Sequence, residues 1–161
     1  MKQITLFGKQ HLLKEQRSTK DTITLKNNII IIDSQEKTAK TLLKEFLNQL
    51  LYDKLVEISE TIKAEGKVEL FGDLDFDIVD NIDNKKERIA KLKGNKVIVK
   101  LNAVVLPETA LKYIVAHELG HTASKRHTNN FWKTVKKMCP NLKREQELLE
   151  EFTEPLLTKI E

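Results

Sequence analysis

The chain has 161 residues, of which 40% are hydrophobic and 32% are charged, and its formal net charge at pH 7 is +4. Five Gly and three Pro exclude collagen-like and Pro/Gly-rich disordered proteins. The single cysteine, Cys139, forms no internal disulfide, and the longest aliphatic run, Ile29–Ile32, is far below the roughly 20 residues that cross a bilayer. No apolar signal-peptide core follows Met1. We therefore predict one cytoplasmic domain over residues 1–161, without membrane association.

Positive charge is concentrated in the middle of the chain. Residues 84–144 carry 15 Lys and Arg against three Asp and Glu, a net charge of +12. The segments 67–83 and 145–161 each have a net charge of −5. The basic segment is either a surface that binds nucleic acid or another polyanion, or a solvated surface that the acidic flanks neutralise. We favour the second, because no aromatic residues alternate with these lysines as a stacking platform for single strands requires.

The first part of the chain, residues 1–66, is expected to contain short strands and one long helix. Apolar residues recur at helical spacing and predict a helix over residues 34–64. Asp33 and Glu36 fit a capping box at its start, and Gly66 stands where a helix commonly ends. The strands are expected at Ile4–Phe7, Thr22–Leu25 and Ile29–Ile32.

The second part, residues 67–106, is expected to form antiparallel strands. Asp73–Asp80 alternates apolar and acidic residues, which is typical of a half-buried strand. Gly94-Asn95 is a two-residue hairpin turn between two further strands. The other strands are expected at Lys67–Phe71, Arg88–Leu92 and Lys96–Leu101.

The third part, residues 107–161, is expected to be helical. Pro107 fits the first turn of a helix whose apolar face continues to Leu119. Two more helices are expected at Asn129–Met138 and Leu142–Glu154. Strands, a long helix, antiparallel strands and then helices together predict an α+β fold.

The segment His117–His121 has the pattern H-E-x-x-H, which carries the most specific chemistry in the chain. On a helix, residues four apart lie on one face, so the imidazoles of His117 and His121 can reach one metal ion. Glu118 is turned about 100° away from His117, so its carboxylate can face a metal-bound water and act as general base. The pattern predicts a zinc site with one ion per chain. Imidazole ligands also suit iron, nickel and copper.

A catalytic zinc ion needs a third protein ligand. His127 is our first candidate, but six residues along an unbroken helix would place it about 9 Å beyond His121. We therefore predict that the helix ends just after His121 and that residues 124–126 turn the chain back. The alternative is a carboxylate from a later helix, and the candidates are Glu145, Glu147, Glu150 and Glu151.

The motif together with His127 and the following Phe131-Trp132 resembles the YgjP-like metallopeptidase domain, and also the related WLM and SprT-like zinc proteases. The resemblance covers about residues 88–145 and includes Arg88-Ile89-Ala90, Lys96–Asn102, Leu106-Pro107 and Tyr113. It implies a small zincin-like fold with an antiparallel sheet, an active-site helix and C-terminal helices. It also implies a metal held by His117, His121 and His127, with Glu118 as the catalytic residue.

Our first hypothesis is a zinc metallopeptidase that acts on a peptide or protein, with the strand Lys96–Asn102 offering its edge to an extended substrate. The alternatives are a zinc-binding module without peptidase activity that associates with nucleic acid through residues 84–144, and a zinc hydrolase of small molecules. We expect Phe131, Trp132 and Tyr113 to pack around the site.

Overall fold

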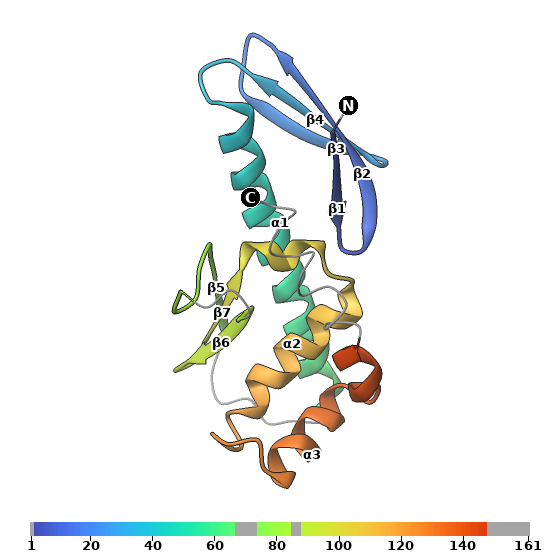
Figure 1. Cartoon of the computed structure of the whole chain (residues 1–161), viewed down its shortest axis with the longest axis vertical. Helices are drawn as coiled ribbons and strands as arrows, with labels where there is room; N and C mark the ends of the chain where they lie inside the picture. The colour runs from blue at the N-terminus through green and yellow to red at the C-terminus, as the bar shows by residue number, and fades with distance from the viewer. Residues whose placement is uncertain (1, 67–73, 85–87, 148–161) are drawn as a thin grey trace.

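A computed structural model describes residues 2–66, 74–84 and 88–147. These residues form an α+β fold in which one sheet lies at the start of a long helix and a second sheet lies beside its middle (Figure 1). The class agrees with the sequence prediction, but the expected antiparallel arrangement does not hold throughout. Each sheet contains one parallel pair of strands and is therefore mixed.

The N-terminal sheet has the strand order β1-β2-β4-β3, with β1 at Lys2–Leu6, β2 at Lys9–Arg17, β3 at Thr22–Lys26 and β4 at Ile29–Ser34. Strands β2 and β4 are parallel, and the two outer pairs are antiparallel. Strand β2 was not predicted, because its apolar residues Leu12 and Leu13 are adjacent and obscure the alternation that is typical of a strand. His11 and Leu13 alternate toward the buried face of this strand.

Helix α1 (Ala39–Glu65) runs from the N-terminal sheet into the other half of the molecule (Figure 1). It starts later than predicted, because the Thr38 hydroxyl caps it and accepts from the Thr41 N–H at 3.1 Å. Asp33 is part of β4, where its carboxylate accepts from Thr22, so the predicted capping box does not form. Gly66 ends the helix at φ 66°, as predicted. None of the helices in the described ranges has both the length and the hydrophobicity that crossing a bilayer requires.

The second sheet has the order β5-β7-β6, with β5 at Asp75–Val79, β6 at Ala90–Lys93 and β7 at Lys96–Lys100. Gly94 turns the β6–β7 hairpin at φ 64°, as predicted. The predicted edge is wrong, because β7 is hydrogen-bonded on both sides, and β5 and β6 are the outer strands. Strand β7 also ends early, at the 3-10 helix η1 (Leu101–Val105). The strand predicted at Lys67–Phe71 lies outside the described residues.

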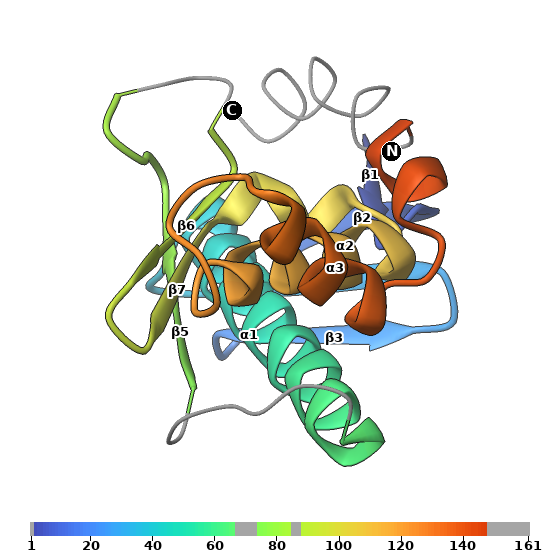
Figure 2. The same cartoon turned by 90° about the horizontal axis from the view of Figure 1, so that it is seen from below.

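Helix α2 (Glu108–Gly120) follows Pro107, and α3 (Asn129–Met138) has the predicted bounds. Residues 142–147 are also helical, and the remainder of the helix predicted at Leu142–Glu154 lies outside the described residues. Helices α2 and α3 lie side by side, and α1 runs below them in Figure 2.

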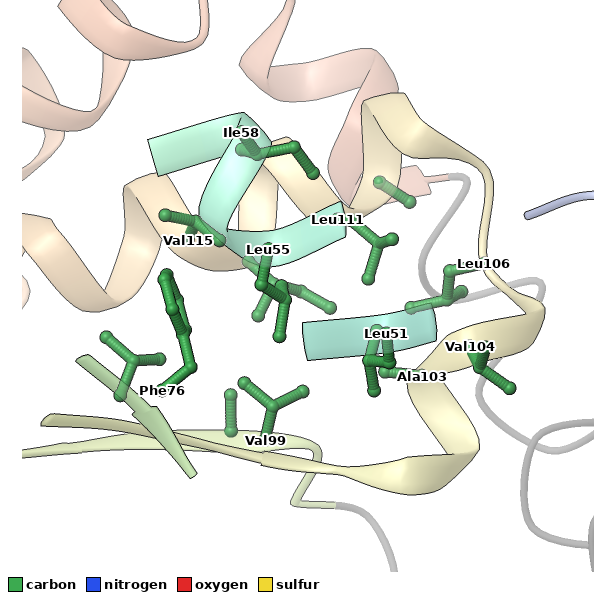
Figure 3. Close-up of a cluster of buried hydrophobic side chains, with 14 of the residues drawn as sticks. Leu51, Leu55, Ile58, Phe76, Val99, Ala103, Val104, Leu106, Leu111 and Val115 are labelled. Atoms are coloured by element: carbon green, nitrogen blue, oxygen red, sulfur yellow. The ribbon is translucent and has the colours of Figure 1, made fainter. Parts of the chain in front are cut away.

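The core of this half is centred on α1. Its residues Leu51 and Leu55 have no solvent-accessible surface and meet side chains from the second sheet, η1 and α2 (Figure 3). Phe76 and Val99 come from the sheet, and Val115 comes from α2. This apolar packing fixes the position of α2, which carries the H-E-x-x-H segment.

The tip of the β1–β2 hairpin joins the N-terminal sheet to the start of α2. The N–H groups of Phe7 and Gly8 donate to the carbonyl oxygens of Val104 and Val105 at 2.8 and 2.9 Å. Both turn residues have positive φ, 49° and 80°, as a two-residue turn that follows the strand twist requires. A side chain on Gly8 would begin 3.2 Å from Pro107 Cγ, so the tip lies directly against the helix entry.

Candidate metal centre

His117 lies on the last turn of α2, and His121 is the residue that caps the end of this helix. The helix ends at Gly120, and the N–H groups of Thr122 and Ala123 bond back to the carbonyl oxygens of Leu119 and Gly120 at 3.0 Å each. The chain therefore turns immediately after His121, as the sequence analysis predicted.

This turn brings the third histidine back to the first two. One ligand atom from each of His117, His121 and His127 lies within 4.8 Å of the other two. The ring centroids are 5.2 to 5.3 Å apart. Three imidazole nitrogens at this separation match the ligand set of a catalytic zinc site, which leaves one position open. The side chains therefore fit the metal that the pattern predicts.

The loop after α2 fixes the orientation of one of these rings. His121 Nδ1 lies 3.1 Å from the carbonyl oxygen of Ser124. Because a carbonyl only accepts, Nδ1 carries the proton and donates, and the lone pair of His121 Nε2 is left for a metal. The Ser124 hydroxyl in turn donates to the Arg126 carbonyl at 2.9 Å, and the Thr128 hydroxyl donates to Ser124 Oγ at 3.1 Å.

The electrostatics of the third histidine also suit a metal ligand. His127 is exposed, but the slight desolvation of its ring lowers its pKa, the nearby His117 and His121 lower this pKa further, and Glu118 opposes the change. A ring with a lowered pKa stays neutral near pH 7 and keeps a lone pair for coordination.

Aromatic side chains support the three histidines, as expected. Phe131 on α3 is fully buried, and its ring centroid lies 4.7 to 5.1 Å from those of the three histidines. The Trp132 ring lies 5.8 Å from that of His127, and Tyr113 lies 5.9 Å from His117. Phe131 therefore connects the packing of α3 to the placement of all three imidazoles.

The carboxylate of Glu118 faces the same space as the histidines. Glu118 is buried, and its Oε1 lies 3.5 Å from His117 Nδ1. It lines a cavity of about 820 Å³ together with His117, His121 and His127. Ala90 and its neighbours on β6 also line this cavity. A buried carboxylate beside three convergent imidazoles is placed to accept a proton within this cavity.

The alternative carboxylate ligands that fall within the described residues do not lie in the histidine cluster. Glu145 is buried and Glu147 is exposed, and neither lies in the histidine cluster. Glu150 and Glu151 fall outside the described residues. Among the described His, Cys, Asp and Glu residues, no other group of three brings its ligand atoms together.

The sequence analysis missed Gly120, which lies inside the motif. A methyl group at this position would lie 2.7 Å from Val135 Cγ2 and 2.8 Å from Phe131 Cε2. Glycine therefore permits the close approach of α2 and α3 that places Phe131 against the histidines. The H-E-x-x-H pattern allows any residue at this position. The crowding comes from Phe131 and Val135, which lie 11 and 15 positions further along the chain.

Two further features were not predicted. The Thr128 hydroxyl caps α3 by accepting from the Phe131 N–H at 3.3 Å. Three cationic residues line the cavity. A Thr directly before a helical pattern indicates a cap, so the sequence carried a signal for the role of Thr128. The cationic residues are Arg88, Lys125 and Arg126.

Cys139 behaves as expected for a small buried side chain. Burial raises the pKa of its thiol, and nearby Glu145 raises it further. A thiol held in its neutral form is a poor nucleophile, so Cys139 adds no second reactive group to this half of the molecule.

The family model described as YgjP-like, metallopeptidase domain, matches residues 1–152. This match extends well beyond the segment 88–145 on which the sequence resemblance rests, and it includes the N-terminal sheet and α1. No curated protein and no solved structure matches the chain.

Proposed function

The chain belongs to the YgjP-like metallopeptidase family, and from this premise we propose that it is a zinc-dependent peptidase with one ion per chain. The observation that carries the proposal is the convergence of His117, His121 and His127, whose ligand atoms lie within 4.8 Å of one another. The metal assignment rests on the chemistry of the set, because three imidazoles and an open position are typical of catalytic zinc.

Zinc held by His117, His121 and His127 would lower the pKa of a bound water to about 7 and would polarise a carbonyl. The protein supplies the remaining steps. Glu118 accepts the proton of the attacking water on its carboxylate and later delivers a proton to the leaving amine. The Ser124 carbonyl keeps His121 in the tautomer that coordinates through Nε2. Burial of Glu118 keeps its carboxylate within the cavity rather than in bulk water.

The strand that lines the cavity favours a peptide over a small molecule as the substrate. The cavity is lined in part by β6, an outer strand of the second sheet, which has a neighbouring strand on one side only among the described residues. An extended peptide can add to such an edge through main-chain hydrogen bonds, which are independent of its side chains. This addition would bring a peptide bond past His117 and Glu118, which line the same cavity.

The proposal is tested with the Glu118→Gln variant, because the substitution removes a proton acceptor and preserves the size of the side chain. Zinc per chain is measured by elemental mass spectrometry, and hydrolysis is followed on a mixture of fluorogenic peptides. We expect about one zinc per chain in both proteins and a loss of hydrolysis of about 10²- to 10⁴-fold in the variant.

Glu145→Gln is the matched control, since it changes a second buried glutamate that lies outside the histidine cluster. It should retain both zinc and hydrolysis. Loss of zinc in this variant would instead make Glu145 a ligand. Full activity of Glu118→Gln would remove Glu118 from the mechanism, and a wild-type protein that takes up no zinc would end the proposal.

A further inference from the structure

Three cationic side chains line the cavity that holds the histidines. Arg88 comes from the segment that enters β6, and Lys125 and Arg126 come from the loop between the second and third histidines. Glu118 is the one acidic side chain among the described lining residues. The loop and β6 are far apart in the sequence, and both reach the same side of the molecule in Figures 1 and 2.

The loop holds its two cations in a defined place. The Arg126 carbonyl accepts from the Ser124 hydroxyl at 2.9 Å and from the Thr128 N–H at 2.8 Å. The side chains of Lys125 and Arg126 are exposed and have no acidic partner among the described residues. Arg88 has Asp83 at 3.6 Å, with both side chains nearly half exposed. Two of the three positive charges are therefore available to a ligand.

We propose that these residues make the cavity selective for peptide segments with acidic side chains next to the scissile bond. This inference rests on the proposed peptidase function and names its substrate class. A peptide lying along β6 would pass between Arg88 at the strand and Lys125-Arg126 on the loop. Carboxylates on the peptide would then meet positive charge on both sides of the histidines, which favours them over neutral side chains.

The placement of the charges favours a peptide over nucleic acid. The three cationic residues line the same cavity as Glu118 and the histidines. A ligand that binds these cations therefore also contacts the proposed catalytic groups. Single-stranded nucleic acid is held by exposed aromatic faces beside positive charge, whereas the cavity's Tyr113 is buried, with 5% of its surface exposed.

The test is a binding measurement that needs no turnover. Fluorescence anisotropy would compare octapeptides that carry two Glu residues with the same peptides carrying Gln, using zinc-loaded and metal-free Glu118→Gln protein. We expect about tenfold tighter binding of the Glu peptides at low salt, since each exposed ion pair contributes up to about fivefold. At 0.5 M salt the preference should largely disappear.

Lys125→Gln with Arg126→Gln should reduce the preference to about threefold or less. Lys136→Gln with Lys137→Gln is the matched control, because it removes two positive charges from exposed positions on α3 that do not line the cavity. This control should keep the tenfold preference, and the circular dichroism and zinc content of both variants should equal those of the parent.

Equal binding of Glu and Gln peptides, or equal losses in the two double variants, would overturn the inference. The inference would also be overturned if the binding of an oligonucleotide depended on Lys125 and Arg126 while the binding of the Glu peptides did not. Hydrolysis by the wild type without any acidic preference would defeat the inference alone. An acidic preference in binding without hydrolysis of any peptide would defeat the peptidase proposal alone.

Discussion

The N-terminal sheet and the metal centre are organised in opposite ways. The three histidines of the centre lie within 11 residues of chain, 117–127, and a helix end with one turn brings them together. The N-terminal sheet depends on pairing between distant segments, since β2 is parallel to β4. Its histidine, His11, is buried, and its Nδ1 donates to the carbonyl oxygen of Lys9 at 2.9 Å. Reactive side chains are therefore concentrated in one half of the molecule.

The two regions nevertheless meet at one structural joint. The hairpin tip of the sheet bonds to η1 immediately before Pro107, at the entry to the helix that carries the motif. Nearby, Lys54 on α1 pairs with Glu108 at 2.9 Å and lies 5.2 Å from the centre of the Phe7 ring. The comparison thus predicts that changes in the centre alter its chemistry locally, whereas changes at the joint alter stability.

The largest expected effect follows from His127→Ala. Removing one of the three proposed ligands should weaken zinc binding by more than the 10- to 100-fold that loss of a supporting hydrogen bond costs. The fold should persist, because the core around α1 consists of apolar side chains and includes none of the three histidines. Zinc affinity from competition with a chelator and far-ultraviolet circular dichroism would measure the two effects.

His11→Ala is the matched control from the other region. It removes a buried histidine, so it should lower the free energy of unfolding and leave zinc affinity unchanged. If His11→Ala weakened zinc binding as much as His127→Ala, the separation between the two regions would be wrong.

A smaller effect is expected from Gly120→Ala, which tests whether packing within the second region places the site. The added methyl group would collide with Val135 and Phe131, and overpacking of this kind costs about 1–3 kcal/mol. Urea denaturation would give the change in the free energy of unfolding. Zinc affinity should also fall, because Phe131 contacts all three histidine rings.

A double-mutant cycle with Val135→Ala checks the physical cause. If the collision is responsible, Gly120→Ala should cost less in the Val135→Ala background than in the wild type. An equal cost in both backgrounds would point to a cause other than crowding between α2 and α3.

The same contrast explains which features the sequence could predict. The histidine cluster, the helix end after His121 and the bounds of α3 depend on spacing and caps within a few residues, and all three were predicted. The H-E-x-x-H pattern also named Glu118, which the structure places in the cavity. The role of each residue in metal binding and catalysis stays a prediction.

Features that depend on distant segments were missed. Strand β2 is defined by its parallel partner. Helix α1 starts later than predicted because Asp33 accepts a hydrogen bond within the N-terminal sheet. The edge strand was assigned to β7 because chain order does not reveal the spatial order β5-β7-β6. The cationic lining joins Arg88 to a loop more than 35 residues later, which no local pattern indicates.

The smallest expected effect comes from Lys54→Met, which loosens the joint between the two regions. The hydrogen bond that Lys54 donates to the Glu108 carboxylate raises the pKa of Lys54 above its usual value, and burial opposes this rise. Because the folded-state pKa is the higher one, the stabilisation is complete below about pH 10.4 and is lost as the pH rises through the folded-state value. We expect Lys54→Met to lower the free energy of unfolding by about 0.5–1 kcal/mol at pH 7. Zinc affinity should not change, and the difference from wild type should shrink at pH 11.

Lys44→Met provides the comparison, since Lys44 on the same helix pairs with Asp80 at 2.7 Å, but both side chains are more than half exposed. Solvent weakens such a pair, so Lys44→Met should cost less than Lys54→Met at pH 7. Equal costs would mean that the contact of Lys54 with Glu108 and Phe7 adds nothing beyond an ordinary surface pair. The two regions would then be held together at this point by the backbone hydrogen bonds of the hairpin tip and the apolar packing around α1, without help from charge.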